Sequence, residues 1–106
     1  MRRGDVVPFK GRKDAQGREQ QGRRYAVVLQ TDALEHWSTV IVAPTSTTPL
    51  GAFFRPQVGI RGKQVYVIVD QVLAVDRARL GRVAGNLSHS ELDAVEDALR
   101  FVLGLS

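Results

Sequence analysis

Arginines and side-chain hydroxyls are the residue types of this chain whose placement could support chemistry. Two consecutive arginines, Arg23 and Arg24, stand where a polar stretch with several glycines meets an apolar, β-branched one, and hydroxyl side chains occupy 45–48. Neighbours in a strand point to opposite faces, so at most one of the two arginines can face a given site. A planar guanidinium matches two phosphate oxygens, and a hydroxyl can orient another. These residue types favour chemistry on a phosphate.

Other catalytic chemistries find little support. Cysteine is absent, and the two histidines, His36 and His89, stand apart in segments expected at the surface. No His/Asp/Glu cluster has metal-ligand spacing, and the phosphate-loop, dinucleotide-binding and serine-elbow motifs are missing. We therefore expect neither a metal ion nor a cofactor.

RNA is the phosphate substrate that this set of residues fits. The 2′-hydroxyl of RNA can attack the adjacent phosphate, so cleavage needs neither a water molecule nor a metal ion. The protein has to supply an acceptor near the 2′-hydroxyl, a cation for the pentavalent phosphate and an acid near the leaving 5′-oxygen. Each preorganised donor at the developing charge contributes about 3 kcal/mol.

Positive charge is concentrated at the N-terminal end. Residues 1–24 hold eight Lys/Arg against three Asp/Glu, a net charge of +5, within a total of +4 for the chain. Such a patch attracts a polyanion. Solubility alone is the alternative explanation, and charge by itself does not decide between the two.

The length of 106 residues fits one domain, which we expect to span 1–106. The longest apolar runs, such as Val65 to Val69, are too short to cross a bilayer. No secretory signal is recognisable. We expect a cytoplasmic protein, since the lack of cysteine is compatible with a reducing compartment.

Apolar stretches bounded by turn residues predict a mainly β chain, with strands over 4–9, 23–31, 38–43, 53–60, 64–70 and 82–85. Pro8 cannot donate to a ladder, so the first strand should be an edge strand or end there. Pro44 should end the third strand, which has the composition of a strand buried on both faces. Polar loops are expected over 10–22 and 45–51.

One helix is clearly predicted near the C-terminus. Ser88 and Glu91 form a capping box, an apolar stripe follows at spacings of three and four, and Gly104 should stop the helix. Single helical turns are expected over 32–37, with Asp32 as cap, and over 75–80. The predicted fold is a small antiparallel β-barrel with a C-terminal helix packed on it.

Five sequence blocks, taken in order, resemble the MazF/PemK family of RNA-cleaving bacterial toxins. The blocks are Arg3-Gly4-Asp5; Glu19-Gln20 with Gly22 and Arg24, running into 26–32; Thr39 to Pro44 with Thr45-Ser46-Thr47; Val69-Asp70-Gln71 with 75–80; and the helix end Leu103-Gly104-Leu105. They cover nearly the whole chain in the family order. Together they identify the chain as a family member, although each block alone is weak.

The resemblance implies an SH3-like β-barrel that forms homodimers. It also implies sequence-specific, metal-independent cleavage of single-stranded RNA, leaving 2′,3′-cyclic phosphate and 5′-hydroxyl ends, and neutralisation by an acidic, MazE-like antitoxin. The key arginine of the family falls on Arg24, and the key threonine falls on Ser46, flanked by Thr45 and Thr47. RNA contacts are expected from Arg18, Glu19, Gln20, Gln21, Arg23, Asp70 and Gln71.

The chain departs from the family pattern at a few positions. Tyr25 replaces the usual proline after the key arginine, Leu73 replaces a basic residue, and Val7-Pro8-Phe9 replaces a Trp-containing run. Tyr25 and Leu73, together with Ser46 in place of the key threonine, leave open a member that has lost its activity and only binds antitoxin. A further alternative is a non-enzymatic protein of the same fold, a topoisomerase poison or a nucleic-acid or protein-binding module. From the residues alone, Arg24 could instead pair with Glu19 or Asp70.

Overall fold

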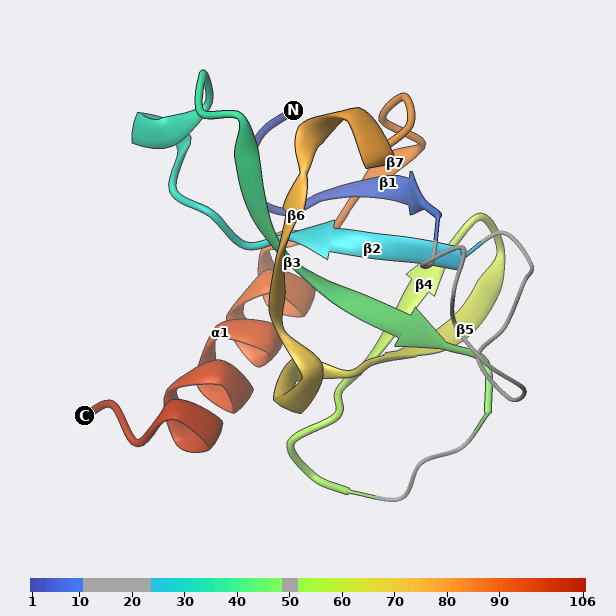
Figure 1. Cartoon of the computed structure of the whole chain (residues 1–106). Helices are drawn as coiled ribbons and strands as arrows, with labels where there is room; N and C mark the ends of the chain where they lie inside the picture. The colour runs from blue at the N-terminus through green and yellow to red at the C-terminus, as the bar shows by residue number, and fades with distance from the viewer. Residues whose placement is uncertain (11–23, 49–51) are drawn as a thin grey trace, which may run out of the picture.

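The computed structural model describes residues 1–10, 24–48 and 52–106. Within these ranges the chain forms a curled antiparallel sheet and one α-helix (Figure 1). The strands are β1 (Asp5–Phe9), β2 (Arg24–Val28), β3 (Thr39–Ser46), β4 (Gln57–Ile60), β5 (Lys63–Val67), β6 (Leu73–Asp76) and β7 (Gly85–Asn86). Three 3₁₀ turns, η1 (Asp32–Leu34), η2 (Val69–Gln71) and η3 (Arg77–Arg79), and the helix α1 (His89–Leu103) complete the described chain.

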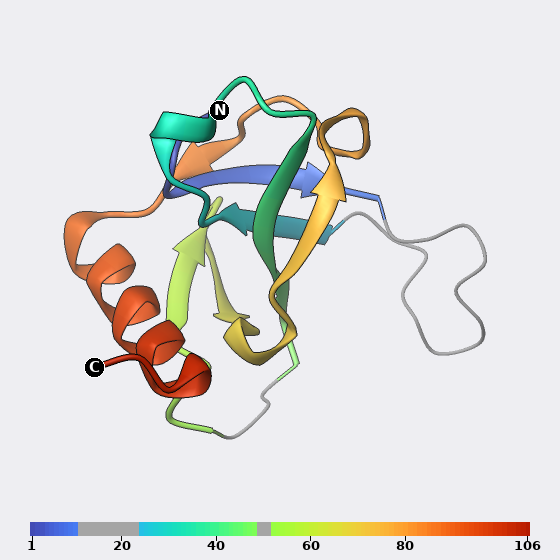
Figure 2. The same ribbon diagram turned by 60° about the vertical axis from the view of Figure 1, so that its left-hand side comes forward.

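The strands run in the order β4-β5-β3-β2-β1-β7, and β6 pairs with β3. Every pairing is antiparallel. Figure 2 shows the sheet curling round on itself, with α1 lying along one side of it. The expected small antiparallel barrel with a C-terminal helix is confirmed. None of the described helices is long and apolar enough to cross a bilayer.

Pro44 does not end the third strand, contrary to the prediction, because β3 continues through it to Ser46. On one edge Pro44 is paired with Ala26 of β2. On the other edge, β3 pairs with β6 up to Val42 and with β5 from Thr45 onward. The carbonyl of Pro44 accepts from the Ile68 amide at 2.8 Å on this second edge. The proline nitrogen therefore faces the gap between two partner strands, where no hydrogen-bond donor is needed.

The core consists of valine to an unusual degree. The largest fully buried side chains are all valines: Val6, Val7, Val27, Val40, Val42, Val58, Val67, Val69 and Val95. They fall into two clusters on opposite faces of the sheet, and only one cluster includes residues of α1. Val65, Val67 and Val69 belong to this core, as predicted. The third strand is buried on both faces only in its second half, because Ile41 remains 43% exposed.

The helix is as predicted at both ends. Ser88 is its N-cap and forms the complete capping box with Glu91, and Gly104 ends it in the left-handed conformation at φ 69°. Glu91 has a second task, because its other carboxylate oxygen accepts from the Gly59 amide of β4 at 2.7 Å. These backbone donors, Gly59 first and then Ser88, lower the pKa of Glu91 below its ordinary value of 4.5. One carboxylate therefore joins the helix start to β4.

Several shorter predictions are wrong in detail. Thr31, not Asp32, caps the turn η1, because its hydroxyl accepts from the Ala33 amide. The segment predicted as a helical turn over 75–80 begins as part of β6, because Val75 pairs with Val40 and is buried there. Only Gly85 and Asn86 form a strand near 82–85. Pro8 lies near the end of β1, which agrees with one alternative of the prediction. The other alternative, an edge strand, is wrong because β1 is paired on both edges.

Three of the strands are also shorter than predicted. The second strand ends at Val28, the fourth begins only at Gln57, and the fifth ends at Val67 and is followed by η2. The predicted loop over 10–22 lies, apart from Lys10, outside the described residues.

The Glu91 contacts predict pH-dependent stability. A carboxyl group whose folded pKa is depressed stabilises the fold fully above its unfolded pKa, and this contribution is lost as the pH falls through the folded value. Glu91→Gln should therefore lower the free energy of unfolding by about 1 kcal/mol at pH 7, and the difference from the wild type should shrink below pH 4.5. Urea denaturation across this pH range measures it. Asp93→Asn, an exposed position of the same helix, is the control; a Glu91→Gln deficit that persisted at pH 2.5 would contradict the assignment.

Candidate functional site

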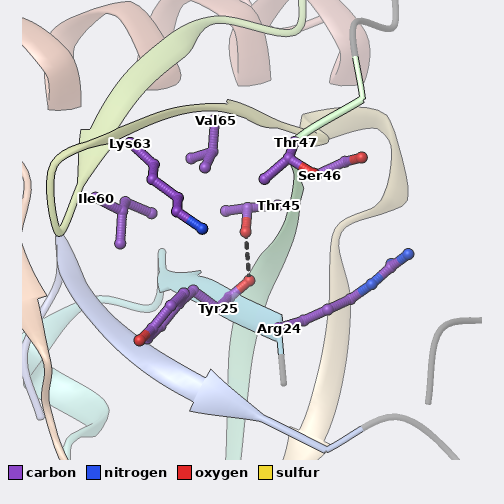
Figure 3. Close-up of a pocket in the computed structure, with 8 residues that line it drawn as sticks. All are labelled: Arg24, Tyr25, Thr45, Ser46, Thr47, Ile60, Lys63 and Val65. Atoms are coloured by element: carbon purple, nitrogen blue, oxygen red, sulfur yellow. Dashed lines mark hydrogen bonds between the residues drawn. The ribbon is translucent and has the colours of Figure 1, made fainter. Parts of the chain in front are cut away.

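A pocket of about 170 Å³ opens where the start of β2, the end of β3 and the β4–β5 hairpin meet (Figure 3). The residues that line it are Arg24, Tyr25, Thr45, Ser46, Thr47, Ile60, Lys63 and Val65. The predicted arginine and all three predicted hydroxyl residues are therefore brought together, although Arg24 comes from β2 and the hydroxyls from the end of β3 and the residue after it. Among the residues that the structure describes, no carboxylate or imidazole belongs to this lining.

Strand alternation separates the two neighbours at the start of β2. Tyr25 packs against the core cluster that includes Val27, so its ring is mainly a packing element. Arg24 points the other way and its guanidinium extends outward along one side of the pocket (Figure 3). Arg24 is half-buried, which keeps its side chain close to the protein while its guanidinium remains within reach of a ligand.

The same alternation distinguishes the hydroxyls at the end of β3. Thr45 is only 5% exposed, and its hydroxyl donates to the Tyr25 carbonyl at 2.8 Å. Ser46 points to the side of the strand toward which Arg24 extends (Figure 3). Its oxygen accepts from the Thr48 amide at 3.1 Å, which leaves the hydroxyl proton available for donation. Thr47 is exposed at the pocket rim.

Lys63 is a pocket residue that the sequence reasoning missed. It is the first residue of β5, and Figure 3 shows its ammonium group directed into the space between Ile60, Thr45 and Tyr25. The available signal was the turn Arg61-Gly62, which places Lys63 and Val65 on the same face of the following strand. Lys63 and Arg24 give the pocket two positive charges.

Asp70 and Gln71 do not line this pocket. Both belong to η2, which contacts α1. The Asp70 carboxylate binds the Arg55 guanidinium through two hydrogen bonds of 2.9 and 2.7 Å. This pairing with Arg55 lowers the pKa of Asp70. The sequence reasoning did not single out Arg55, and the carboxylate expected to hold RNA is already engaged in an ion pair.

The remaining predicted RNA contacts lie outside the described residues: Arg18, Glu19, Gln20, Gln21 and Arg23. Within the described ranges, no group of three or more His, Asp or Glu side chains could hold a metal ion.

An aromatic cluster occupies a different part of the surface. Phe53 packs edge-on against Phe54 and Phe101, with ring centroids 5.5 and 4.7 Å apart. Phe53 and Phe101 are nevertheless 78% and 58% exposed. The cluster ties the segment before β4 to the end of α1.

Comparisons with known proteins place the chain among bacterial toxins. Residues 2–103 match the sequence profile of a family described as a PemK-like, MazF-like toxin of type II toxin–antitoxin system. A toxin candidate of Mycobacterium tuberculosis (strain ATCC 25618 / H37Rv) is 38% identical over 90 residues, covering 84% of each chain. Endoribonuclease MazF of Staphylococcus epidermidis is 33% identical over 113 residues, covering 100% of this chain and 93% of the relative.

Solved structures share the fold. MazF of Deinococcus radiodurans superposes with a TM-score of 0.81 at 24% identity, covering 99% of this chain and 97% of the other. A MazE–MazF structure from the same organism gives 0.82 at 25% identity, covering 100% and 97%.

The Thr45 hydrogen bond predicts a structural role for that hydroxyl. Thr45→Val keeps the shape of the side chain but leaves the Tyr25 carbonyl without this donor. We expect the free energy of unfolding to fall by about 1–3 kcal/mol, measured by urea denaturation. Thr47→Val, at the exposed rim, should change it by less than about 0.5 kcal/mol. Equal stability of the Thr45→Val variant and the wild type would show that the bond contributes nothing.

Proposed function

Because this chain belongs to the PemK-like, MazF-like toxin family of type II toxin–antitoxin systems, we propose that it is an endoribonuclease that cuts single-stranded RNA without a metal ion. One observation carries the proposal: Arg24 and the hydroxyls of 45–47 line the same pocket, although 20 or more residues separate them in the sequence. The pocket is positively charged, as binding of a phosphodiester requires.

In the proposed reaction the 2′-oxygen of one nucleotide attacks its own 3′-phosphate. A bond forms between the 2′-oxygen and phosphorus, and the bond from phosphorus to the 5′-oxygen of the next nucleotide breaks. The 2′-hydroxyl gives up its proton and the leaving oxygen gains one, so the products carry a 2′,3′-cyclic phosphate and a 5′-hydroxyl. Negative charge grows on the non-bridging oxygens meanwhile, and the fixed donors of Arg24 can stabilise it.

Ser46 is the hydroxyl best suited to assist. It lies on the side of β3 toward which Arg24 extends, and its proton is not committed in the hydrogen bond with Thr48. Thr45 is a poorer candidate because its hydroxyl donates to the Tyr25 carbonyl. Donation from Ser46 to a phosphate oxygen would leave that hydrogen bond undisturbed.

We propose that the partners are those of the family: a second copy of this chain and an acidic, MazE-like antitoxin. Support comes from the solved structures that resemble it, one of which is a mycobacterial endoribonuclease in complex with its cognate antitoxin and another MazE–MazF of Deinococcus radiodurans. The net charge of +4 favours an acidic partner. We further propose that 1–106 is one domain, given the family match over 2–103, and that it acts in the cytoplasm.

Removing the guanidinium tests the reaction directly. A long RNA of mixed sequence, incubated in EDTA, should be cut at specific sites by the wild type and left intact by Arg24→Ala. Loss of the principal charge donor should slow cleavage by at least about 10²–10³-fold, while RNA binding persists. The ends are mapped and assayed for the cyclic phosphate.

Arg100→Ala is the matched control, because Arg100 lies on α1 in an exposed ion pair with Asp97. It should cut at the wild-type rate. Cleavage that requires magnesium would refute the metal-free reaction, and normal cleavage by Arg24→Ala would refute the role of Arg24. A wild type that binds RNA without cutting it would leave only a non-enzymatic function.

Ser46 gives a second, independent prediction. Ser46→Ala should slow cleavage by about 10²-fold, because one preorganised donor is lost, and Ser46→Thr should retain most of the rate because it restores the hydroxyl. Single-turnover cleavage of one short RNA measures both. A Ser46→Ala variant as fast as the wild type would transfer the role to Thr47, whose Ala variant is compared in the same assay.

A further inference from the structure

The β4–β5 hairpin places a lysine inside the candidate site rather than at its edge. The Lys63 ammonium enters the pocket between Ile60, Thr45 and Tyr25 (Figure 3). Arg24, by contrast, runs along the outer side of the pocket. The two cations therefore occupy different parts of the pocket, and a single phosphate group has no need of both.

The hairpin holds Lys63 in a defined position. Ile60 pairs with Lys63 across a two-residue turn, in which Arg61 and Gly62 have φ values of 50° and 82°. Two positive φ values in a two-residue loop are typical of a type I′ turn, which matches the twist of a hairpin. The Glu91 carboxylate fixes the neighbouring Gly59 amide. The base of the Lys63 side chain is therefore set by backbone structure.

The surroundings of the ammonium group suit a nucleobase. Within the described part of the chain, the Lys63 side chain makes neither an ion pair nor a hydrogen bond, although it lies beside polar groups. Ile60 and Val65 give the pocket apolar walls. Its volume of about 170 Å³ is well below the roughly 300–1,000 Å³ that accommodates drug-sized ligands. A space of this size is closer to that of a single base than to that of a longer stretch of RNA.

We propose that Lys63 determines which base the protein accepts next to the scissile phosphate, by donating a hydrogen bond to a carbonyl oxygen of that base. An ammonium group is only a donor. Guanine and uracil present a carbonyl oxygen where adenine and cytosine present an amino group, so the pocket selects guanine or uracil. The inference rests on the proposed ribonuclease function and adds a substrate preference to it.

The test compares base preferences rather than rates alone. Wild type and Lys63→Met cut an RNA library with randomised positions around the cleavage site, and sequencing gives the base frequencies on each side of the cut. We expect the wild type to favour guanine or uracil at one position by about 5-fold to 100-fold. In Lys63→Met that preference should fall toward equal use of all four bases, while Arg24-dependent cleavage continues.

Arg61→Met is the matched control. It removes a positive charge from the same turn, at a position that does not line the pocket, and should leave the base preference unchanged. Unchanged preference in Lys63→Met would overturn the inference and leave the ribonuclease function standing. Uniform slowing over all sequences, with a salt dependence weaker by about one phosphate contact, would also overturn it and identify Lys63 as a backbone contact. A wild type that cuts no RNA would overturn both proposals.

Discussion

The change of partner along β3 is the constraint on which the site depends. The strand pairs with β6 in its first half and with β5 in its last two residues, while β2 runs along its other edge. Pro44 stands at the change: its nitrogen has no hydrogen to donate, and its carbonyl accepts from the Ile68 amide on the edge where β3 changes partner. Had β3 ended there, Thr45 and Ser46 would belong to a loop, without their fixed register against β5.

Because the register of the strands is fixed, consecutive residues point to opposite sides and have different roles. In β2, Tyr25 packs against the core and Arg24 extends outward; in β3, Thr45 faces inward and Ser46 outward. The hydrogen bond from Thr45 to the Tyr25 carbonyl joins the two inward members, so the two outward members are held relative to each other. Sites built on strands keep their geometry better than sites built on loops. The buried hydroxyl of Thr45 therefore helps to hold the neighbouring, half-buried Ser46 in position.

Sequence signals that depend on near neighbours predicted the structure correctly, whereas contacts between distant residues were not predicted. The capping box at Ser88 and the stop at Gly104 depend on neighbours within one turn, so the sequence alone predicted α1 correctly. The rule that proline ends a strand failed at Pro44, since it ignores which edge the nitrogen faces. Lys63 was missed because its approach to Thr45 depends on β5 pairing with β3, and the Arg55 partner of Asp70 lies 15 residues away. Arg24 was predicted as the key arginine from the resemblance to the family, not from the periodicity of the sequence.

The valine core bears on how such a protein can diverge. Valine has a single side-chain torsion and, as a β-branched residue, few rotamers, so the nine fully buried valines of the described residues leave little room for repacking. These valines fix the positions of the strands, but none of them lines the pocket. Exposed positions of the pocket lining, such as Thr47 and Lys63, can be exchanged without disturbing that interior. Related proteins of this fold could then acquire new sequence preferences through substitutions at exposed positions, while the buried core and the fold stay the same.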